Sequence, residues 1–116
     1  MIEGPPPIAC RLKALDASQR ARQKDLLAVV RGKIRRIVEL EQGFEVELPS
    51  DFESFMEIAE WVNLERRCCA FAAFAIESRS DGSLWVRATG GDGAKDVLVA
   101  EMGLSVNPAR PGGPPS

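Results

Sequence analysis

The chain has 116 residues, a formal net charge of −2 and 45% hydrophobic residues, which suffices for one modest core and is too little for two ordinary domains. It contains no histidine, so the Ser-His-Asp and Cys-His catalytic arrangements and the His-Glu-x-x-His zinc helix are excluded. No stretch approaches the roughly 18 apolar residues of a membrane span, and the first residues lack the features of a secretion signal. We therefore expect one soluble cytoplasmic domain with no membrane partner.

Charge is distributed in blocks along the chain. Residues 11–36 carry nine Lys or Arg and two acids, whereas residues 39–60 carry eight acids and no Lys or Arg. Such blocks form either a basic surface for an anionic partner or two oppositely charged faces of one domain that attract each other. We favour the second because the basic residues are spaced along an amphipathic helix, and a nucleic-acid partner is not expected. The basic residues of the less favoured interpretation are Arg20, Arg22, Lys24, Arg31, Lys33, Arg35 and Arg36.

The ends of the chain differ in composition from its middle. Residues 1–7 and 107–116 are rich in proline, with added glycine at the C-terminal end, and we expect both to be disordered around a single domain over 8–106. Residues 8–15 alternate loosely, which favours a short strand or extended lead-in with Cys10 facing inward. Asp16 is then the N-cap of a helix that runs to about Arg31 and stops at Gly32.

A hairpin and a second helix follow. The apolar alternation over residues 33–48, divided by a turn at 41–43, predicts two antiparallel strands. After Pro49, Ser50 or Asp51 caps a helix that reaches Cys68 or Cys69. The spacing of apolar residues by three and four predicts its buried side, made of Phe52, Phe55, Ala59 and Val62.

The remainder of the chain repeats this order. Residues 70–76 and 83–89 predict a second hairpin, residues 90–93 a turn with Asp92 as helix cap, and residues 94–102 a last helix ended by Gly103. The expected fold class is therefore α+β, with a mostly antiparallel sheet of two hairpins, joined by an N-terminal strand if residues 8–15 pair, packed against helices on one face. The order of the strands does not follow from the sequence.

The three cysteines form the candidate site. Cys68 and Cys69 close the second helix, where helical geometry turns Cys69 toward the core and Cys68 toward its edge. If Cys10 on the first strand lies against this helix end, the three thiolates can hold a thiophilic ion such as zinc, copper(I), mercury(II) or trivalent arsenic. Zinc requires a fourth ligand, for which Glu65 or water is available. We expect a non-catalytic metal-binding protein with Cys10, Cys68 and Cys69 as ligands.

Two other interpretations stay open. Cysteine commonly packs as a small buried hydrophobe, so the chain is alternatively a structural or protein-interaction domain, expected to be a homodimer. An enzyme is less favoured because no histidine base is present. Among the nearby carboxylates, Glu57 and Glu60 are expected on a solvated face, whereas Glu65, one turn before the cysteines, has a better claim to a role at the site.

The double-cysteine segment resembles a known motif. The chain is similar to a family of small uncharacterised bacterial proteins with a Glu-Arg-x-Cys-Cys-Pro-Phe motif, and the resemblance covers nearly everything from Cys10 to Met102. Ala70 stands where the family pattern has proline. The resemblance implies one compact domain and highlights the three cysteines, but it implies no reaction or substrate. The matching segments are Cys10-x-Leu12-x-Ala14-Leu15-Asp16, Arg20-x-Arg22, Gly43-Phe44, Ala59-Glu60-Trp61-Val62-x-Leu64-Glu65-Arg66-Arg67-Cys68-Cys69-Ala70-Phe71 and Leu84-Trp85-Val86-Arg87-Ala88-Thr89-Gly90.

Overall fold

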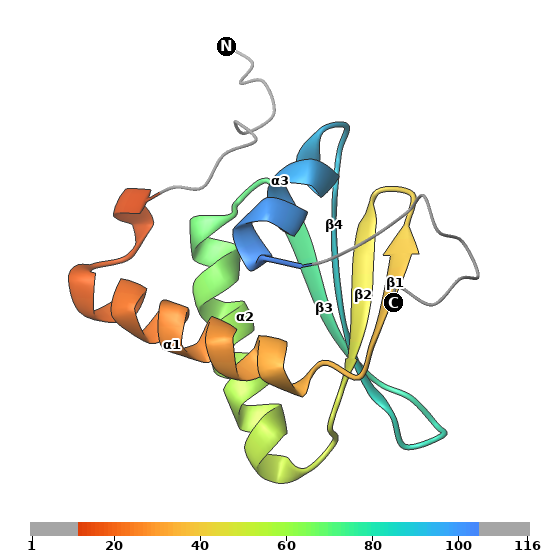
Figure 1. Ribbon diagram of the computed structural model, residues 1–116. Helices are drawn as coiled ribbons and strands as arrows, with labels where there is room; N and C mark the ends of the chain where they lie inside the picture. The colour runs from red at the N-terminus through yellow and green to blue at the C-terminus, as the bar shows by residue number, and fades with distance from the viewer. Residues whose placement is uncertain (1–11, 105–116) are drawn as a thin grey trace.

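The computed structural model describes residues 12–104 (Figure 1). The end segments 1–7 and 107–116, expected to be disordered, and Cys10 lie outside the described residues. The elements in chain order are a 3-10 helix η1 (Leu12–Ala14), α1 (Ala17–Lys33), β1 (Arg36–Leu40), β2 (Gly43–Leu48), α2 (Phe52–Cys68), β3 (Ala72–Ser78), β4 (Leu84–Gly90) and α3 (Ala94–Met102).

The four strands form one antiparallel sheet in the order β1-β2-β4-β3. The two hairpins therefore meet through their second strands, with Val46 of β2 opposite both Ile37 and Val86. The helices gather on one side of this sheet (Figure 1). The predicted α+β fold with two hairpins and helices on one face is confirmed.

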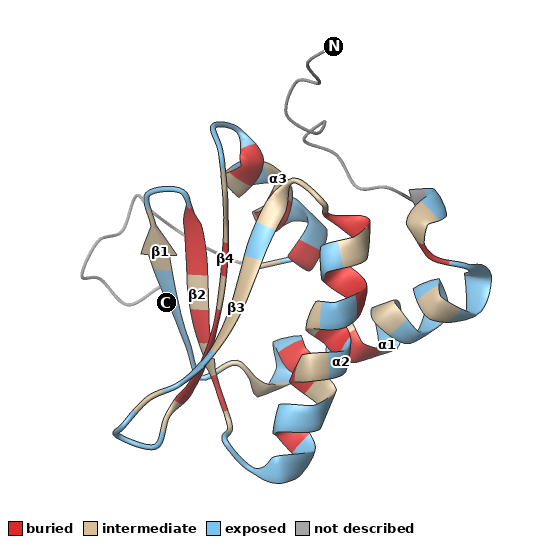
Figure 2. Ribbon diagram, turned by 180° about the vertical axis from the view of Figure 1, so that it is seen from behind, coloured by how far each residue is buried: buried red, intermediate tan, exposed pale blue. Residues whose placement is uncertain are grey.

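Alternation along β2 separates the two faces of the sheet. Phe44, Val46 and Leu48 are buried toward the helices, as the red bands of β2 in Figure 2 indicate. Glu45 and Glu47 point to the opposite face. Apolar residues on one face of β2 and β4, together with partly buried ones of β3, thus supply the sheet's half of the core.

The face of the sheet away from the helices is covered by side chains. Two guanidinium groups lie over the Trp85 ring, with Arg79 at 4.2 Å and Arg36 at 5.1 Å from its centroid. Arg79 also donates to both carboxylate oxygens of Glu45, each at 3.1 Å. Guanidinium groups over an aromatic ring are attracted by its π electrons, so this arrangement shields Trp85 from water without a covering helix.

The start of the described chain and the end of α1 differ from expectation. Leu12–Ala14 form a 3-10 turn, so the expected strand or extended lead-in is wrong for these residues. Asp16 caps α1 as predicted, in a capping box with Gln19. However, α1 continues through Gly32 to Lys33, whose ammonium group donates to Ser54 Oγ at 3.0 Å and pairs with Glu57 at 2.6 Å. This tertiary anchor holds the last turn of α1 in spite of glycine's low helix propensity.

Helix α2 begins after the predicted cap Asp51, but its buried side was predicted wrongly. Phe52 is 78% exposed and Phe55 is 40% exposed. The residues that α2 buries are Ser54, Ile58, Trp61, Leu64, Glu65 and Cys68. The predicted spacing of three and four residues was right, but the predicted buried face of the helix was wrong. The buried face is the one that contacts α1 and the sheet.

The last helix is set by glycines. Gly93, at φ 87°, is the N-cap of α3 and makes no side-chain cap bond, so the prediction of Asp92 as the cap is wrong. Gly103, at φ 63°, ends the helix as predicted, since a left-handed residue suits glycine. Ala94, Leu98 and Met102 are buried where α3 packs on β2 and β4. Among the described residues, no helix is long and apolar enough to cross a membrane.

The oppositely charged blocks face each other. Arg22 pairs with Glu60 at 2.8 Å, Lys33 with Glu57 at 2.6 Å, and Arg36 with Glu47 at 2.7 Å. Each pair joins the basic segment 11–36 to the acidic segment 39–60. The expectation that these segments attract each other within one domain is confirmed for these three pairs.

Candidate functional site

The end of α2 holds two buried thiols in different surroundings. Cys68 is the last residue of α2 and is 3% exposed, whereas Cys69 is its C-cap and is fully buried. The Cys69 backbone N–H donates to the carbonyl oxygen of Glu65 at 2.6 Å, and its thiol donates to Glu65 Oε1 at 3.6 Å. As predicted, Cys69 faces the core. Cys68 is also buried as a residue, but it borders a pocket.

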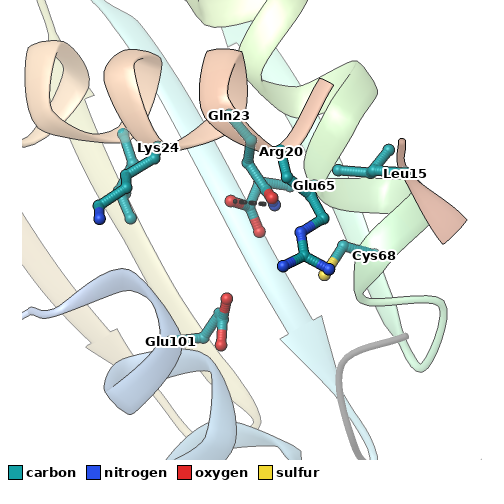
Figure 3. A pocket seen from close by; sticks show the side chains of 8 residues that line it. Leu15, Arg20, Gln23, Lys24, Glu65, Cys68 and Glu101 are labelled. Atoms are coloured by element: carbon teal, nitrogen blue, oxygen red, sulfur yellow. Dashed lines mark hydrogen bonds between the residues drawn. The ribbon is translucent and has the colours of Figure 1, made fainter. Parts of the chain in front are cut away.

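This pocket lies where α1, the end of α2 and α3 converge (Figure 3). Its volume is about 220 Å³, and its wall is largely apolar. In Figure 3, the Arg20 guanidinium extends toward the Cys68 sulfur, and Lys24 and Glu101 lie at the other end. The full lining consists of Leu15, Arg20, Gln23, Lys24, Leu27, Glu65, Cys68 and Glu101.

Glu65 is the buried polar group of the pocket. Its residue exposure is 0%, and Gln23 Nε2 donates to its Oε2 at 3.0 Å (Figure 3, dashed line). Burial raises the pKa of Glu65 above its usual 4.5, because a carboxylate loses hydration there. The bonds from Gln23 and Cys69 act in the opposite direction, and the charge of Glu101 raises the pKa further. The carboxyl therefore keeps its proton to a higher pH than an exposed glutamate.

Trp61, one turn before Glu65, completes this buried group. Its indole N–H is buried and makes no hydrogen bond of good geometry among the described residues. It lies close enough to the Glu65 carboxyl to favour the ionised form slightly. The Trp61 ring belongs to the core and does not line the pocket beside Cys68.

The segment that leads into α1 is anchored at the same end of α2. Arg67 Nη2 donates to the carbonyl oxygen of Ala14 at 3.1 Å, and Leu15 both joins the core and lines the pocket. The start of the described chain therefore lies close to Cys68. The hydrogen bond from Arg67 holds it there, and no sequence pattern predicted this contact.

The structure describes some of the predicted metal ligands but not Cys10. It brings Cys68 and Cys69 to Glu65, but no group of three Cys, Asp, Glu or His side chains among residues 12–104 is arranged to hold a metal ion. Cys10 lies outside that range, so a three-thiolate site stays a prediction. A zinc site with Glu65 as fourth ligand is disfavoured, since Glu65 already accepts bonds from Gln23 and Cys69.

Sequence reasoning missed most of the pocket. The sequence could identify Glu65, because it lies three and four residues before the two cysteines, and residues at that spacing share a helix face. Arg20, Gln23 and Glu101 come from other helices, and no local pattern links them to Cys68. The charge and hydrogen-bonding character of the pocket is thus a property of the tertiary structure.

Comparison with known proteins adds no further constraint. The chain matches no protein-family model, no curated protein and no solved structure. The resemblance to the double-cysteine family therefore stays a prediction, and the site is interpreted from its own chemistry.

Proposed function

We propose that this chain binds a thiophilic metal or metalloid ion through Cys10, Cys68 and Cys69 and catalyses no reaction. The observation that carries the proposal is the position of Cys68 on a pocket of about 220 Å³ beside two polar side chains, Arg20 and Glu65. A thiol that served only for packing needs no such space. Soft thiolate ligands select ions of the copper(I), mercury(II) and arsenic(III) kind over magnesium or calcium.

Chain length supports Cys10 as a partner of Cys68. Cys10 precedes Ala14 by four residues, and a chain of that length spans at most about 14 Å. Ala14 is bonded to Arg67, the neighbour of Cys68 on α2. A link of this length is long enough for Cys10 to reach Cys68, and the titration of Cys10→Ser tests that contact.

The contact between the Cys69 thiol and Glu65 favours ions that need only two thiolates. Its thiol donates to Glu65 in a fully buried position, and joining a metal would break that contact. A two-coordinate ion such as mercury(II) or copper(I) needs only Cys10 and Cys68. Inorganic arsenic(III) uses all three thiols and gives up the Cys69 contact.

The test is a titration of the reduced protein with mercury(II), copper(I), arsenite and zinc, followed by sulfur-to-metal absorption and native mass. We expect one tightly bound mercury(II) per chain, lost in Cys68→Ser and in Cys10→Ser. Cys69→Ser separates two-thiolate from three-thiolate binding: serine also donates to Glu65, and the variant should keep mercury(II) while losing arsenite. Failure of every ion to bind stoichiometrically overturns the proposal.

One observation favours the second candidate, an interaction domain that forms a homodimer. Three large apolar side chains are exposed together on the first half of α2, with Phe52 at 78%, Met56 at 51% and Phe55 at 40%. Exposed apolar clusters of this kind commonly mark interaction sites. Sedimentation of the wild type and of Phe52→Glu tests this candidate: a dimer that the substitution dissociates supports it, and a wild-type monomer at high concentration contradicts it.

A further inference from the structure

The pocket beside Cys68 combines an apolar wall with charged side chains. Its volume is about 220 Å³, and Leu15 and Leu27 contribute apolar surface to the wall. An apolar protein cavity of about 150 Å³ holds a benzene molecule, so a ring of that size is within this volume. The pocket is therefore large enough for a small organic molecule as well as for water or an ion.

Charged side chains from two helices line the same pocket. Arg20 and Lys24 belong to α1 and Glu101 belongs to α3, and all three residues are exposed. In Figure 3 the Arg20 guanidinium extends into the pocket toward the Cys68 sulfur. These exposed residues carry two positive charges and one negative charge, so together they favour an anionic group over a cationic one.

The buried acid Glu65 opposes this positive charge less than an exposed glutamate would. Its residue exposure is 0%, and burial raises its pKa, so the carboxyl becomes negatively charged only at a higher pH than usual. Both of its oxygens already accept bonds, from Gln23 and from Cys69. We therefore expect an anionic group to contact Arg20 and not the Glu65 end of the pocket.

We propose that this pocket binds a small organic monocarboxylate, whose carboxylate pairs with the Arg20 guanidinium and whose apolar body, up to one aromatic ring in size, packs on Leu15 and Leu27. A guanidinium offers two parallel N–H donors to a carboxylate, which makes arginine suited to this contact. Lys24 adds a second positive charge to the lining. No cysteine binds the carboxylate, so the inference goes beyond the proposed function and does not rest on it.

The experiment titrates the reduced, metal-free full chain with benzoate, benzamide and acetate, and follows backbone amide shifts by nuclear magnetic resonance. We expect benzoate to bind saturably and to shift the amides of residues that line the pocket. Benzamide has the ring without the charge, and acetate has the charge without the ring. Each should bind about tenfold or more weakly than benzoate.

Two pairs of variants test the two contacts separately. Arg20→Gln removes the guanidinium and should weaken benzoate binding about tenfold or more. Arg35→Gln removes an exposed arginine outside the pocket lining and should leave the affinity unchanged. Leu27→Trp fills the pocket and should abolish binding, whereas Val29→Trp adds the same side chain to the exposed side of α1 and should keep it.

The opposite results overturn the inference. Without saturable benzoate binding there is no such site, and equal affinity for benzoate and benzamide shows that the pocket does not recognise the charge. Equal losses in Arg20→Gln and Arg35→Gln indicate attraction to the charge of the whole chain. Should Leu27→Trp not fold, 2-naphthoate and the wild type decide: affinity below that for benzoate supports a pocket of limited volume, and higher affinity contradicts it.

Discussion

Glu65 is a carboxyl group enclosed by protein, at a position where most helices carry an apolar side chain. Its two oxygens accept from Gln23 and Cys69, and its exposure is 0%. Buried polar groups are tolerated when they are hydrogen-bonded, whereas a buried charge without a counter-ion is costly. Burial raises the pKa of Glu65, so its carboxyl holds a proton to a higher pH than that of an exposed glutamate.

Replacing Glu65 by glutamine should change the pH dependence of stability. Folding raises the pKa of Glu65, so its contribution to stability is fully present below the unfolded value near 4.5 and is lost as pH rises through the folded pKa. Glutamine is neutral at every pH and keeps the shape of the side chain. We expect Glu65→Gln to gain stability relative to wild type as pH rises from about 4.5 to 8.

Urea unfolding of both proteins across this pH range measures the effect. Glu60→Gln is the matched control, since Glu60 lies on the exposed side of α2 and its pKa is lowered by the bond to Arg22. Its substitution should change stability by the same amount throughout this range, because the lowered pKa places the pH dependence of Glu60 below the unfolded value near 4.5. A difference between Glu65→Gln and wild type that does not vary with pH would contradict a raised pKa for Glu65.

At the scale of elements, the central strand pair β2 and β4 depends on one glycine. A Cβ atom on Gly43 would lie 2.0 Å from the carbonyl oxygen of Ala88 and 2.8 Å from the Thr89 Cα. Both atoms belong to the paired backbone, which cannot move aside as a flexible side chain does. The close approach of β2 to β4 at this end therefore requires glycine.

Two glycine substitutions compare this crowded position with an open one. Gly43→Ala should lower the free energy of unfolding by roughly 1–3 kcal/mol, as expected for an overpacked core position. Gly32→Ala in α1 meets no atom within 4 Å and should raise it by about 0.5–1 kcal/mol, because alanine is the better helix former. Chemical denaturation measures both. Equal effects of the two substitutions would refute the close approach at Gly43.

At the scale of the whole molecule, ion pairs join segments that are distant in sequence. Arg22 makes two bonds to Glu60, at 2.8 and 2.9 Å, across the α1 and α2 interface. Both side chains are about half exposed, so water and salt weaken this attraction. The blocks of opposite charge thus chiefly determine which surfaces of α1 and α2 face each other.

A charge exchange at this pair tests that conclusion. Arg22→Glu and Glu60→Arg should each lower the thermal midpoint, and the double exchange should recover most of the loss. The recovery should shrink at about 1 M salt, where charges are screened within a few ångström. If the double variant is no more stable than the singles at low salt, the pair does not contribute to the orientation of α1 on α2.

Local chemistry was predictable from the sequence. The caps Asp16 and Asp51 accept bonds from residues three positions later, and each hairpin brings neighbouring segments together through a short turn. Such interactions depend on residues that are close along the chain. For this reason the helices, the hairpins, the α+β class and the inward direction of Cys69 followed from the sequence alone.

The tertiary structure decided what distant residues do together. Phe52 and Phe55 satisfied the periodicity of a buried face, yet α1 and the sheet enclose the side that carries Ser54, Trp61 and Glu65. The strand order, the partners of Glu65 and the pocket at Cys68 likewise depend on contacts between elements. Periodicity sets the spacing of a helix face but not its direction, because burial is a property of the surface that packs against it.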